Sequence, residues 1–250
     1  MSLTLIGTGI SFDLTLSAID ELKQCDEIYI EQYTNLIEEE KITTLEQKIN
    51  KKIIRIERKD VESSFLVNKA KTAKIALLAS GDPLTATTHV SLVIDAKTAK
   101  IAVKIIPNSS IFTVAAGKAG LQIYRFGKTA SLVNPRPNYT PTSALDLIRE
   151  NQQRNAHSLV LLDTEPKPME AKVALEMLKA LLQATSSQST SSLKLDAMVV
   201  LSRLGEKDEK ISYGTIEKLL ASNLGKPPFS IIIPAKLHMV EEEYLELLKV

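Results

Sequence analysis

The sequence contains a single cysteine, Cys25, and no tryptophan, and aromatic residues make up only 4% of it. One cysteine excludes an internal disulfide, and the three histidines lie too far apart in the sequence to form a local metal motif, so we expect no metal site. No apolar run approaches the roughly 20 residues of a membrane helix, and the N-terminal residues lack the features of a secretory signal. We therefore expect a cytoplasmic protein without a membrane partner.

The charge pattern and the missing motifs exclude further classes of protein. The formal net charge is +1, with basic and acidic residues intermixed, so the one-signed field of a nucleic-acid binder is absent. No Walker sequence, HExxH pair or GxSxG elbow occurs, which argues against an NTPase, a zinc protease and a serine hydrolase. In the first loop, GTGISF, Phe12 stands where a dinucleotide fingerprint needs its third glycine.

Short apolar runs alternate with helical patterns along the whole chain, which is typical of parallel βαβ units. We infer two α/β domains, residues 1–112 with a Gly-Asp-Pro motif and residues 113–250. A Ser/Thr-rich segment at residues 184–192 is expected to form a surface loop. The expected strands lie at residues 3–7, 27–31, 53–56, 75–80, 101–106, 158–164, 197–204 and 229–235, and the expected helices include residues 17–24, 36–50, 87–99 and 111–119.

The segment KIALLASGDPLTATTH, residues 74–89, places a carboxylate directly after an apolar strand. Gly81 permits close approach to the backbone, and Pro83 suits a first helical position, which leaves Asp82 as the expected N-cap. Ligands of open α/β sheets also bind at the carboxyl ends of strands. A capping role and a ligand-binding role for Asp82 therefore both remain open on local grounds.

Small or polar residues follow several of the expected strands. If all strands run parallel, these residues share one sheet edge and can enclose a small-molecule pocket. The pocket would contain no nucleophile with an activating base, which favours positioning of a reactive cosubstrate. Among the histidines, His89 is expected to pack or cap, His157 to be exposed, and His238 to be either a turn residue or a functional one. The strand-end residues are Gly7, Gly9, Glu31, Gly81, Asp82, Ser109, Ser110, Asp163 and His238.

The order of motifs resembles one family over nearly the whole chain. GTGI, EQYTN, GDPLTATTH, PNSSIF, GLQIYRFGKTASLV, PTSALDLI, LVLLD and PPFSIIIPAKLHMVEEEYL closely resemble the diphthine synthase family, within the class III tetrapyrrole-methylase-like methyltransferases. The Gly-Asp-Pro motif alone indicates only the broad superfamily. The ATTH continuation, the IYRFGK segment and the terminal KLH with its acidic helix are more particular to diphthine synthases.

The resemblance implies a homodimer of two-domain α/β subunits with S-adenosylmethionine in the cleft between domains and S-adenosylhomocysteine as product. It further implies methylation, in diphthamide biosynthesis, of the 3-amino-3-carboxypropyl-histidine amino group on translation elongation factor 2, which yields trimethylated diphthine. It assigns no general base, and no nucleic acid or metal. The cofactor-binding positions that it implies are Ile10, Asp82, Thr85, Ser110, Ile111, Leu162, Tyr213 and His238.

Two other functions stay open at this point. A precorrin-type tetrapyrrole methyltransferase would share the Gly-Asp-Pro pocket, and a non-catalytic α/β binding module would keep only the fold. The chain also departs from the usual family pattern at Thr8 and Ile10, where leucine is frequent, and at Thr85. Whether the enzyme stops at three methyl groups or also esterifies the carboxylate is likewise open.

Overall fold

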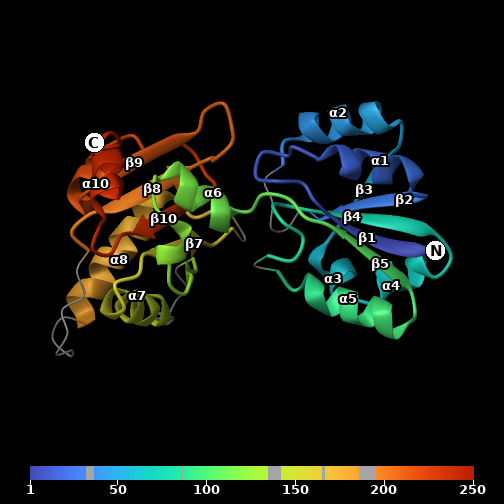
Figure 1. Ribbon diagram of the computed structural model, residues 1–250, viewed down its shortest axis with the longest axis horizontal. Coiled ribbons are helices and arrows are strands. Elements are labelled where there is room, and N and C mark those ends of the chain that lie inside the picture. Colours follow the sequence, from blue (N-terminus) through green and yellow to red (C-terminus); the bar gives the residue numbers. More distant parts are fainter. Residues whose placement is uncertain (32–36, 86, 135–141, 165–166, 186–194) are drawn as a thin grey trace. The chain divides into compact units, whose positions relative to one another are not determined.

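The computed structural model describes residues 1–31, 37–85, 87–134, 142–164, 167–185 and 195–250 (Figure 1). The chain divides into two compact units, Met1–Ile111 and Phe112–Val250, which we describe separately. Most of the EQYTN motif, residues 32–35, lies outside the described residues. So does most of the Ser/Thr-rich segment, although the helix before it extends to Thr185.

The first unit is a five-stranded sheet with the order β3-β2-β4-β1-β5, in which every neighbouring pair is parallel. Its helices lie on both faces, with α1 and α2 on one side and α3, α4 and α5 on the other (Figure 1). This is the layered arrangement that the alternating pattern predicts. The elements are β1 Ser2–Gly7, α1 Leu16–Gln24, β2 Glu27–Glu31, α2 Glu39–Ile49, β3 Ile53–Ile56, α3 Arg58–Val61, α4 Phe65–Ala70, β4 Lys74–Ala79, α5 His89–Thr98 and β5 Ala102–Ile106.

Two apolar clusters sandwich this sheet because successive strand residues point to opposite faces. In β1, Leu3 and Leu5 pack with Leu92 of α5, whereas Ile6 packs with Leu22 of α1. All five side chains are at most 3% exposed. Burial on both faces fixes the register, so the carboxyl ends of the strands form one edge with defined loops.

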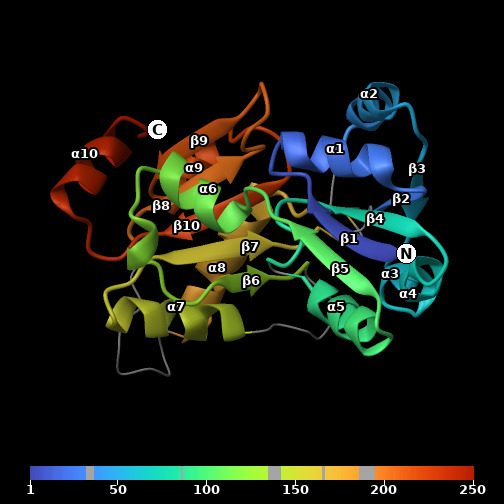
Figure 2. The same ribbon diagram turned by 45° about the vertical axis from the view of Figure 1, so that its right-hand side comes forward.

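The second unit has a five-stranded sheet of mixed direction, in the order β6-β7-β10-β8-β9. Strands β6 and β7 are parallel, but β10 is antiparallel to both of its neighbours and β9 is antiparallel to β8 (Figure 2). The expectation that all strand ends share one edge is therefore wrong for this unit. The elements are α6 Ile111–Lys118, the 3-10 helix η1 Ile123–Arg125, β6 Ala130–Leu132, α7 Ser143–Gln153, β7 Ser158–Leu162, α8 Ala171–Thr185, β8 Met198–Ser202, β9 Lys210–Gly214, α9 Ile216–Ala221, β10 Phe229–Ile233 and α10 Met239–Glu246.

One local prediction fails at the Gly-Asp-Pro segment. Residues 82–85 form a turn, and the following helix begins only at His89, so Asp82 is not its N-cap and Pro83 is not a helical residue.

The prediction that His157 is exposed is also wrong, because this side chain is fully buried. Its partners lie in segments far away in the sequence, which a local reading of a polar turn does not reveal.

Candidate active site

Two glycines connect the loops at the carboxyl edge of the first sheet. Gly9 and Gly81 exchange backbone hydrogen bonds of 3.0 and 3.2 Å, and both have left-handed φ angles, of +70° and +63°. Gly7 lies directly beneath this bridge. A Cβ atom on Gly7 would lie 2.5 Å from the carbonyl oxygen of Gly81 and 2.9 Å from Pro83 Cδ. The loops after β1 and β4 can approach this closely only because glycine occupies these positions.

Asp82 accepts hydrogen bonds at both carboxylate oxygens. Its Oδ1 atom accepts from the Leu84 amide at 3.0 Å and from the Thr85 hydroxyl at 2.9 Å. Its Oδ2 atom accepts from the backbone amide of Asn108 at 3.3 Å. The carboxylate thus closes its own turn and joins it to the loop after β5. Asp82 therefore caps its own turn and a neighbouring loop, and not a helix as the local sequence predicted.

Asn108 and Ser109 connect the third loop to the first. The Asn108 side-chain amide donates to the carbonyl oxygens of Gly7, at 3.0 Å, and Asp13, at 2.8 Å. The Ser109 hydroxyl accepts from the amide of Ile10 at 3.2 Å. Three loops that are distant in the sequence therefore form one hydrogen-bonded edge, and Asn108, which the sequence analysis did not single out, is its central side chain.

The structure brings together the first five of the sequence-predicted cofactor positions at this edge. Ile10, Asp82 and Thr85 are partly buried in the first two loops, and Ser110 and Ile111 follow in the third. Ser110 is only 8% exposed. The side chain of Glu31, at the end of β2, is also buried at this edge.

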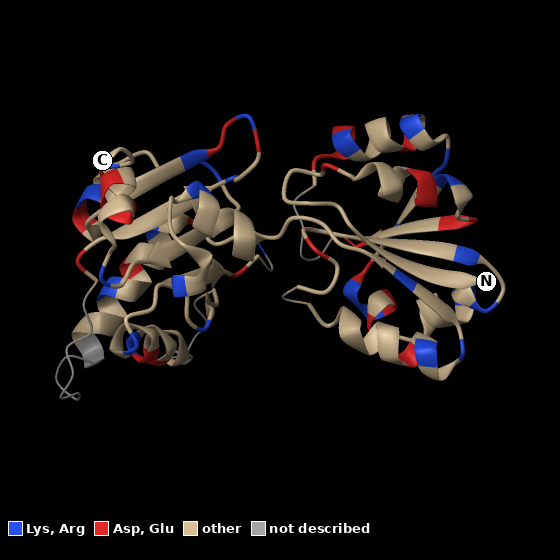
Figure 3. Ribbon diagram, in the orientation of Figure 1, with Lys and Arg blue, Asp and Glu red and all other residues tan. Residues whose placement is uncertain are grey.

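The charges of the three loops suit a cation. Residues 7–13, 80–85 and 107–111 include no lysine or arginine, and their charged side chains are Asp13 and Asp82. Lys41, from α2, reaches the carbonyl of Ser11 from outside the loops. Elsewhere Lys and Arg are interspersed with Asp and Glu over the helices and loops of each unit (Figure 3).

The other three predicted positions do not come together. Leu162 ends β7 at the edge where β10 begins with Phe229. Tyr213 pairs with Val199, which in turn pairs with Ile232 near the end of β10. Tyr213 therefore lies near the opposite edge of the sheet, where β10 ends and the chain continues to His238. The antiparallel β10 causes this separation, so Leu162 and His238 belong to opposite edges of the second sheet.

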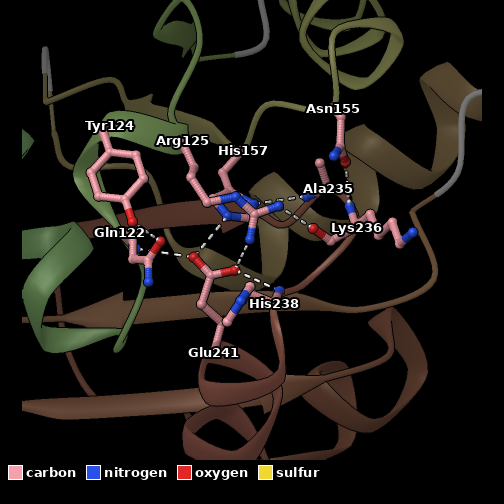
Figure 4. Close-up of polar contacts among 9 residues, drawn as sticks. All are labelled: Gln122, Tyr124, Arg125, Asn155, His157, Ala235, Lys236, His238 and Glu241. Atoms are coloured by element: carbon pink, nitrogen blue, oxygen red, sulfur yellow. Dashed lines mark hydrogen bonds and ion pairs between the residues drawn. The ribbon is translucent and has the colours of Figure 1, made fainter.

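At the His238 edge, a buried carboxylate gathers several donors (Figure 4). Glu241 is fully buried; its Oε1 atom accepts from the Gln122 amide at 3.1 Å and from His157 Nε2 at 3.3 Å. Its Oε2 atom accepts from the His238 amide at 2.9 Å and pairs with the Arg125 guanidinium. The carboxylate therefore fixes the start of α10 to η1 and to the start of β7.

The hydrogen bonds define the charge states of this cluster. His157 Nδ1 accepts from the Ala235 amide at 2.9 Å, so the ring proton lies on Nε2 and the ring is neutral. Burial lowers the pKa of His157 and maintains that neutral form. Burial alone would raise the pKa of Glu241, but the amides of His238 and Gln122 and the nearby His157 outweigh it, and the pKa of Glu241 is lowered. The cluster is an ionised, hydrogen-bonded structural centre.

The described residues offer little covalent or metal chemistry. Burial raises the pKa of the Cys25 thiol to about 11, so Cys25 is not an activated nucleophile. No cluster of three or more His, Cys, Asp or Glu side chains that could hold a metal occurs in the described part of the chain. Within those same residues, no helix has both the length and the apolar character needed to span a membrane.

Comparisons with known proteins identify the family. The model for "Tetrapyrrole (Corrin/Porphyrin) Methylases" matches residues 2–220. A diphthine synthase of Methanocaldococcus jannaschii is 40% identical over 253 residues, covering 98% of each chain. That of Methanothermobacter thermautotrophicus is 34% identical over 97% of this chain and 94% of its own. A crystal structure of diphthine synthase covers all of this chain and 96% of its own, with a TM-score of 0.88 and 30% identity.

The chain belongs to the diphthine synthase family. The two-unit α/β fold of this family, within the tetrapyrrole methylases, is confirmed for the chain, as is its class: it is an enzyme that transfers a methyl group from a donor. The full-length match to diphthine synthases does not favour a precorrin methyltransferase or a non-catalytic module.

Proposed function

We propose that this diphthine synthase family member uses S-adenosylmethionine to methylate the amino group of a 3-amino-3-carboxypropyl-histidine on translation elongation factor 2, a step of diphthamide biosynthesis. The observation that carries the proposal is the near-complete match to diphthine synthases that are 34% and 40% identical to this chain. A protein substrate also agrees with the near-neutral net charge, because recognition here does not depend on a strong long-range field.

The donor is proposed to bind at the carboxyl edge of the first sheet. Its sulfonium is a cation, and the three loops contribute Asp13 and Asp82 but no basic residue. The candidate contacts in this unit are Ile10, Asp82, Thr85, Ser110 and Ile111. For Leu162, Tyr213 and His238 of the second unit, contact with the donor stays a prediction. Because Asp82 is already engaged by Leu84, Thr85 and Asn108, we assign it the role of shaping the turn that faces the donor.

The chemistry needs positioning above all. When bound, S-adenosylmethionine supplies an electrophilic methyl group attached to a positively charged sulfur. The chain must hold the donor and the substrate amine in line and exclude water. An α-amino group with a reference pKa of about 8 is mostly protonated at neutral pH, so a proton must leave the amine before it can accept a methyl group. Among the described residues of the three loops there is no activated nucleophile, which agrees with direct transfer.

Mass spectrometry of the protein substrate tests the reaction directly. Elongation factor 2 carrying the unmethylated side chain is incubated with the purified protein and S-adenosylmethionine, and the modified peptide is sequenced. We expect three successive mass steps of one methyl group on that residue, and a fourth step would indicate esterification of the carboxylate. Methylation of a precorrin with none on elongation factor 2 would refute the proposed substrate.

The Asp82→Asn variant tests the proposed donor site. In this variant an NH₂ group replaces one carboxylate oxygen and faces another donor, either the Asn108 N–H or the Thr85 Oγ–H. The hydrogen bond at that atom is lost and the turn should loosen. We expect the affinity for S-adenosylmethionine to fall by about tenfold, which corresponds to about 1.4 kcal/mol. Asp95→Asn, on the exposed face of α5, is the matched control and should bind as the wild type does. Equal affinities by calorimetry for wild type and both variants would remove Asp82 from the site.

A further inference from the structure

His89 has two ring nitrogens in very different situations. The residue begins α5 and is 1% exposed, and its Nδ1 atom lies 2.9 Å from the carbonyl oxygen of Pro83. A carbonyl can only accept, so the hydrogen bond places the ring proton on Nδ1. Nε2 is then an acceptor, and it is buried without a hydrogen-bond partner among the described residues.

This arrangement is unfavourable for a side chain that only fills space. A buried acceptor without a donor costs free energy, and leucine or methionine would occupy a similar volume without that cost. The imidazole offers one thing at this position that an apolar side chain lacks, which is the hydrogen bond from Nδ1 to Pro83. The contribution of His89 therefore lies in what this bond holds.

The bond holds the turn at residues 82–85. Pro83 lies between Asp82, whose carboxylate is fixed by the loop after β5, and Thr85, whose amide donates to the Asp82 carbonyl at 3.3 Å. On the β1 side, the turn is attached through the bridge of Gly81 to Gly9. His89 supplies an attachment from the helix that follows, and it holds the carbonyl end of the Pro83 to Leu84 peptide, whose amide end donates to Asp82.

We infer that His89 is a positioning residue for methyl transfer, which acts by setting the turn at residues 82–85 against the methyl donor. The inference rests on the proposed function, because it is the donor that the turn is proposed to contact. His89 touches neither donor nor substrate in this scheme. It acts through the Pro83 carbonyl, on the peptide that lies between Asp82 and Thr85.

A pair of isosteric variants separates the two ring nitrogens. In His89→Asn, the side-chain amide can place an N–H near the position of Nδ1, whereas in His89→Gln the amide group lies near the position of Nε2. We expect His89→Gln to lose the bond to Pro83, to bind S-adenosylmethionine about tenfold more weakly and to exchange the Leu84 and Thr85 amides about tenfold faster. His89→Asn should retain most of both properties.

Leu45→Ala is the control for stability alone. Leu45 is on α2 and is 5% exposed, and it packs into the apolar cluster on the other face of the sheet, which does not include Leu84 of the turn. This variant should lower the melting temperature while it leaves donor affinity and exchange of the turn amides unchanged at temperatures where the protein is folded.

The two readouts distinguish the inference from the proposed function. If the wild type binds no S-adenosylmethionine, the proposed function fails, and the exchange of the turn amides still tests the attachment by His89. If the wild type binds the donor but His89→Gln matches it in affinity and in amide exchange, the positioning role is overturned. Equal losses in His89→Asn and His89→Gln would likewise overturn it, because the loss would then not depend on a donor at Nδ1.

Discussion

Replacing Glu241 by glutamine should release the start of α10 from the rest of the second unit. Glutamine keeps the size of the side chain and can still accept from Gln122 and His157 at one atom. At the other atom, an NH₂ group would face the His238 amide and the Arg125 guanidinium, both of which are donors. The substitution therefore breaks a buried ion pair and a capping bond together.

The magnitude follows from the burial of this carboxylate. The Glu241 and Arg125 side chains are 1% and 17% exposed, so solvent screens their interaction little. Removing one partner of a buried ion pair costs about 3 to 5 kcal/mol. We take the lower value, about 3 kcal/mol, because Arg125 keeps its bond to the Lys236 carbonyl. For a chain of this size, such a loss lowers the melting temperature by about 6 to 12 °C.

Calorimetry and hydrogen exchange measure this effect together. Because the chain has two units, the transition of the second unit must be followed by the exchange of amides in α10 as well as by heat capacity. The control is Glu243→Gln, an exposed neighbour on the same helix, which should change stability by less than about 0.5 kcal/mol. If Glu241→Gln and Glu243→Gln melt together and exchange alike, the carboxylate cluster does not hold α10.

Three further changes test other parts of the structure. Gly7→Ala places a Cβ 2.5 Å from a backbone oxygen, so it should lower the free energy of unfolding by about 1 to 3 kcal/mol and weaken donor binding. Gly117→Ala, which has open space around it in α6, should raise the free energy of unfolding by about 0.5 to 1 kcal/mol. Chemical denaturation measures the two stabilities, and calorimetry measures donor binding. Because the pKa of His157 is lowered in the folded state, the imidazole of the unfolded chain is protonated at a higher pH than that of the folded protein. The free energy of unfolding should therefore decrease as the pH falls below 6.5, by at most about 1.4 kcal/mol per pH unit. His157→Gln should flatten that slope in melts recorded at several pH values. Cys25, with a pKa of about 11, should react with iodoacetamide at pH 8 only after unfolding, and modification of the folded protein at the rate of a free thiol would contradict its burial.

The first unit was largely predictable because both faces of its central strands, β1, β2 and β4, are buried. Strands at residues 27–31 and 53–56 were predicted with the limits that the structure shows, although the two middle residues of β3, Ile54 and Arg55, are exposed. The turn after β4 was not predicted, because Asp-Pro is equally compatible with a helix start. A turn forms there instead of a helix because Asp82 accepts a hydrogen bond from the backbone amide of Asn108, which lies 26 residues further along the chain.

The second unit shows what local patterns leave undetermined. An apolar run such as residues 229–233 predicts a strand, but its direction relative to its neighbours depends on the connection and leaves no mark in the run itself. The short strand β9, KISYG, was missed because its polar residues resemble a loop. The cluster around Glu241 was missed for another reason, since its partners Gln122 and His157 are separated from it by 119 and 84 residues.

The direction of β10 also decides between the sequence-predicted ligand positions of the second unit. Leu162 and His238 lie at opposite edges of the sheet, so they do not line a site at one single edge. The His238 backbone is part of the cluster that anchors α10, which gives this residue a structural role, whereas Leu162 ends a strand at the kind of edge where ligands of α/β sheets bind. We therefore expect Leu162→Ala to weaken S-adenosylmethionine binding and His238→Ala to leave it unchanged, as measured by calorimetry. Weaker binding in His238→Ala, with wild-type affinity in Leu162→Ala, would place the donor at the α10 edge and reverse this assignment.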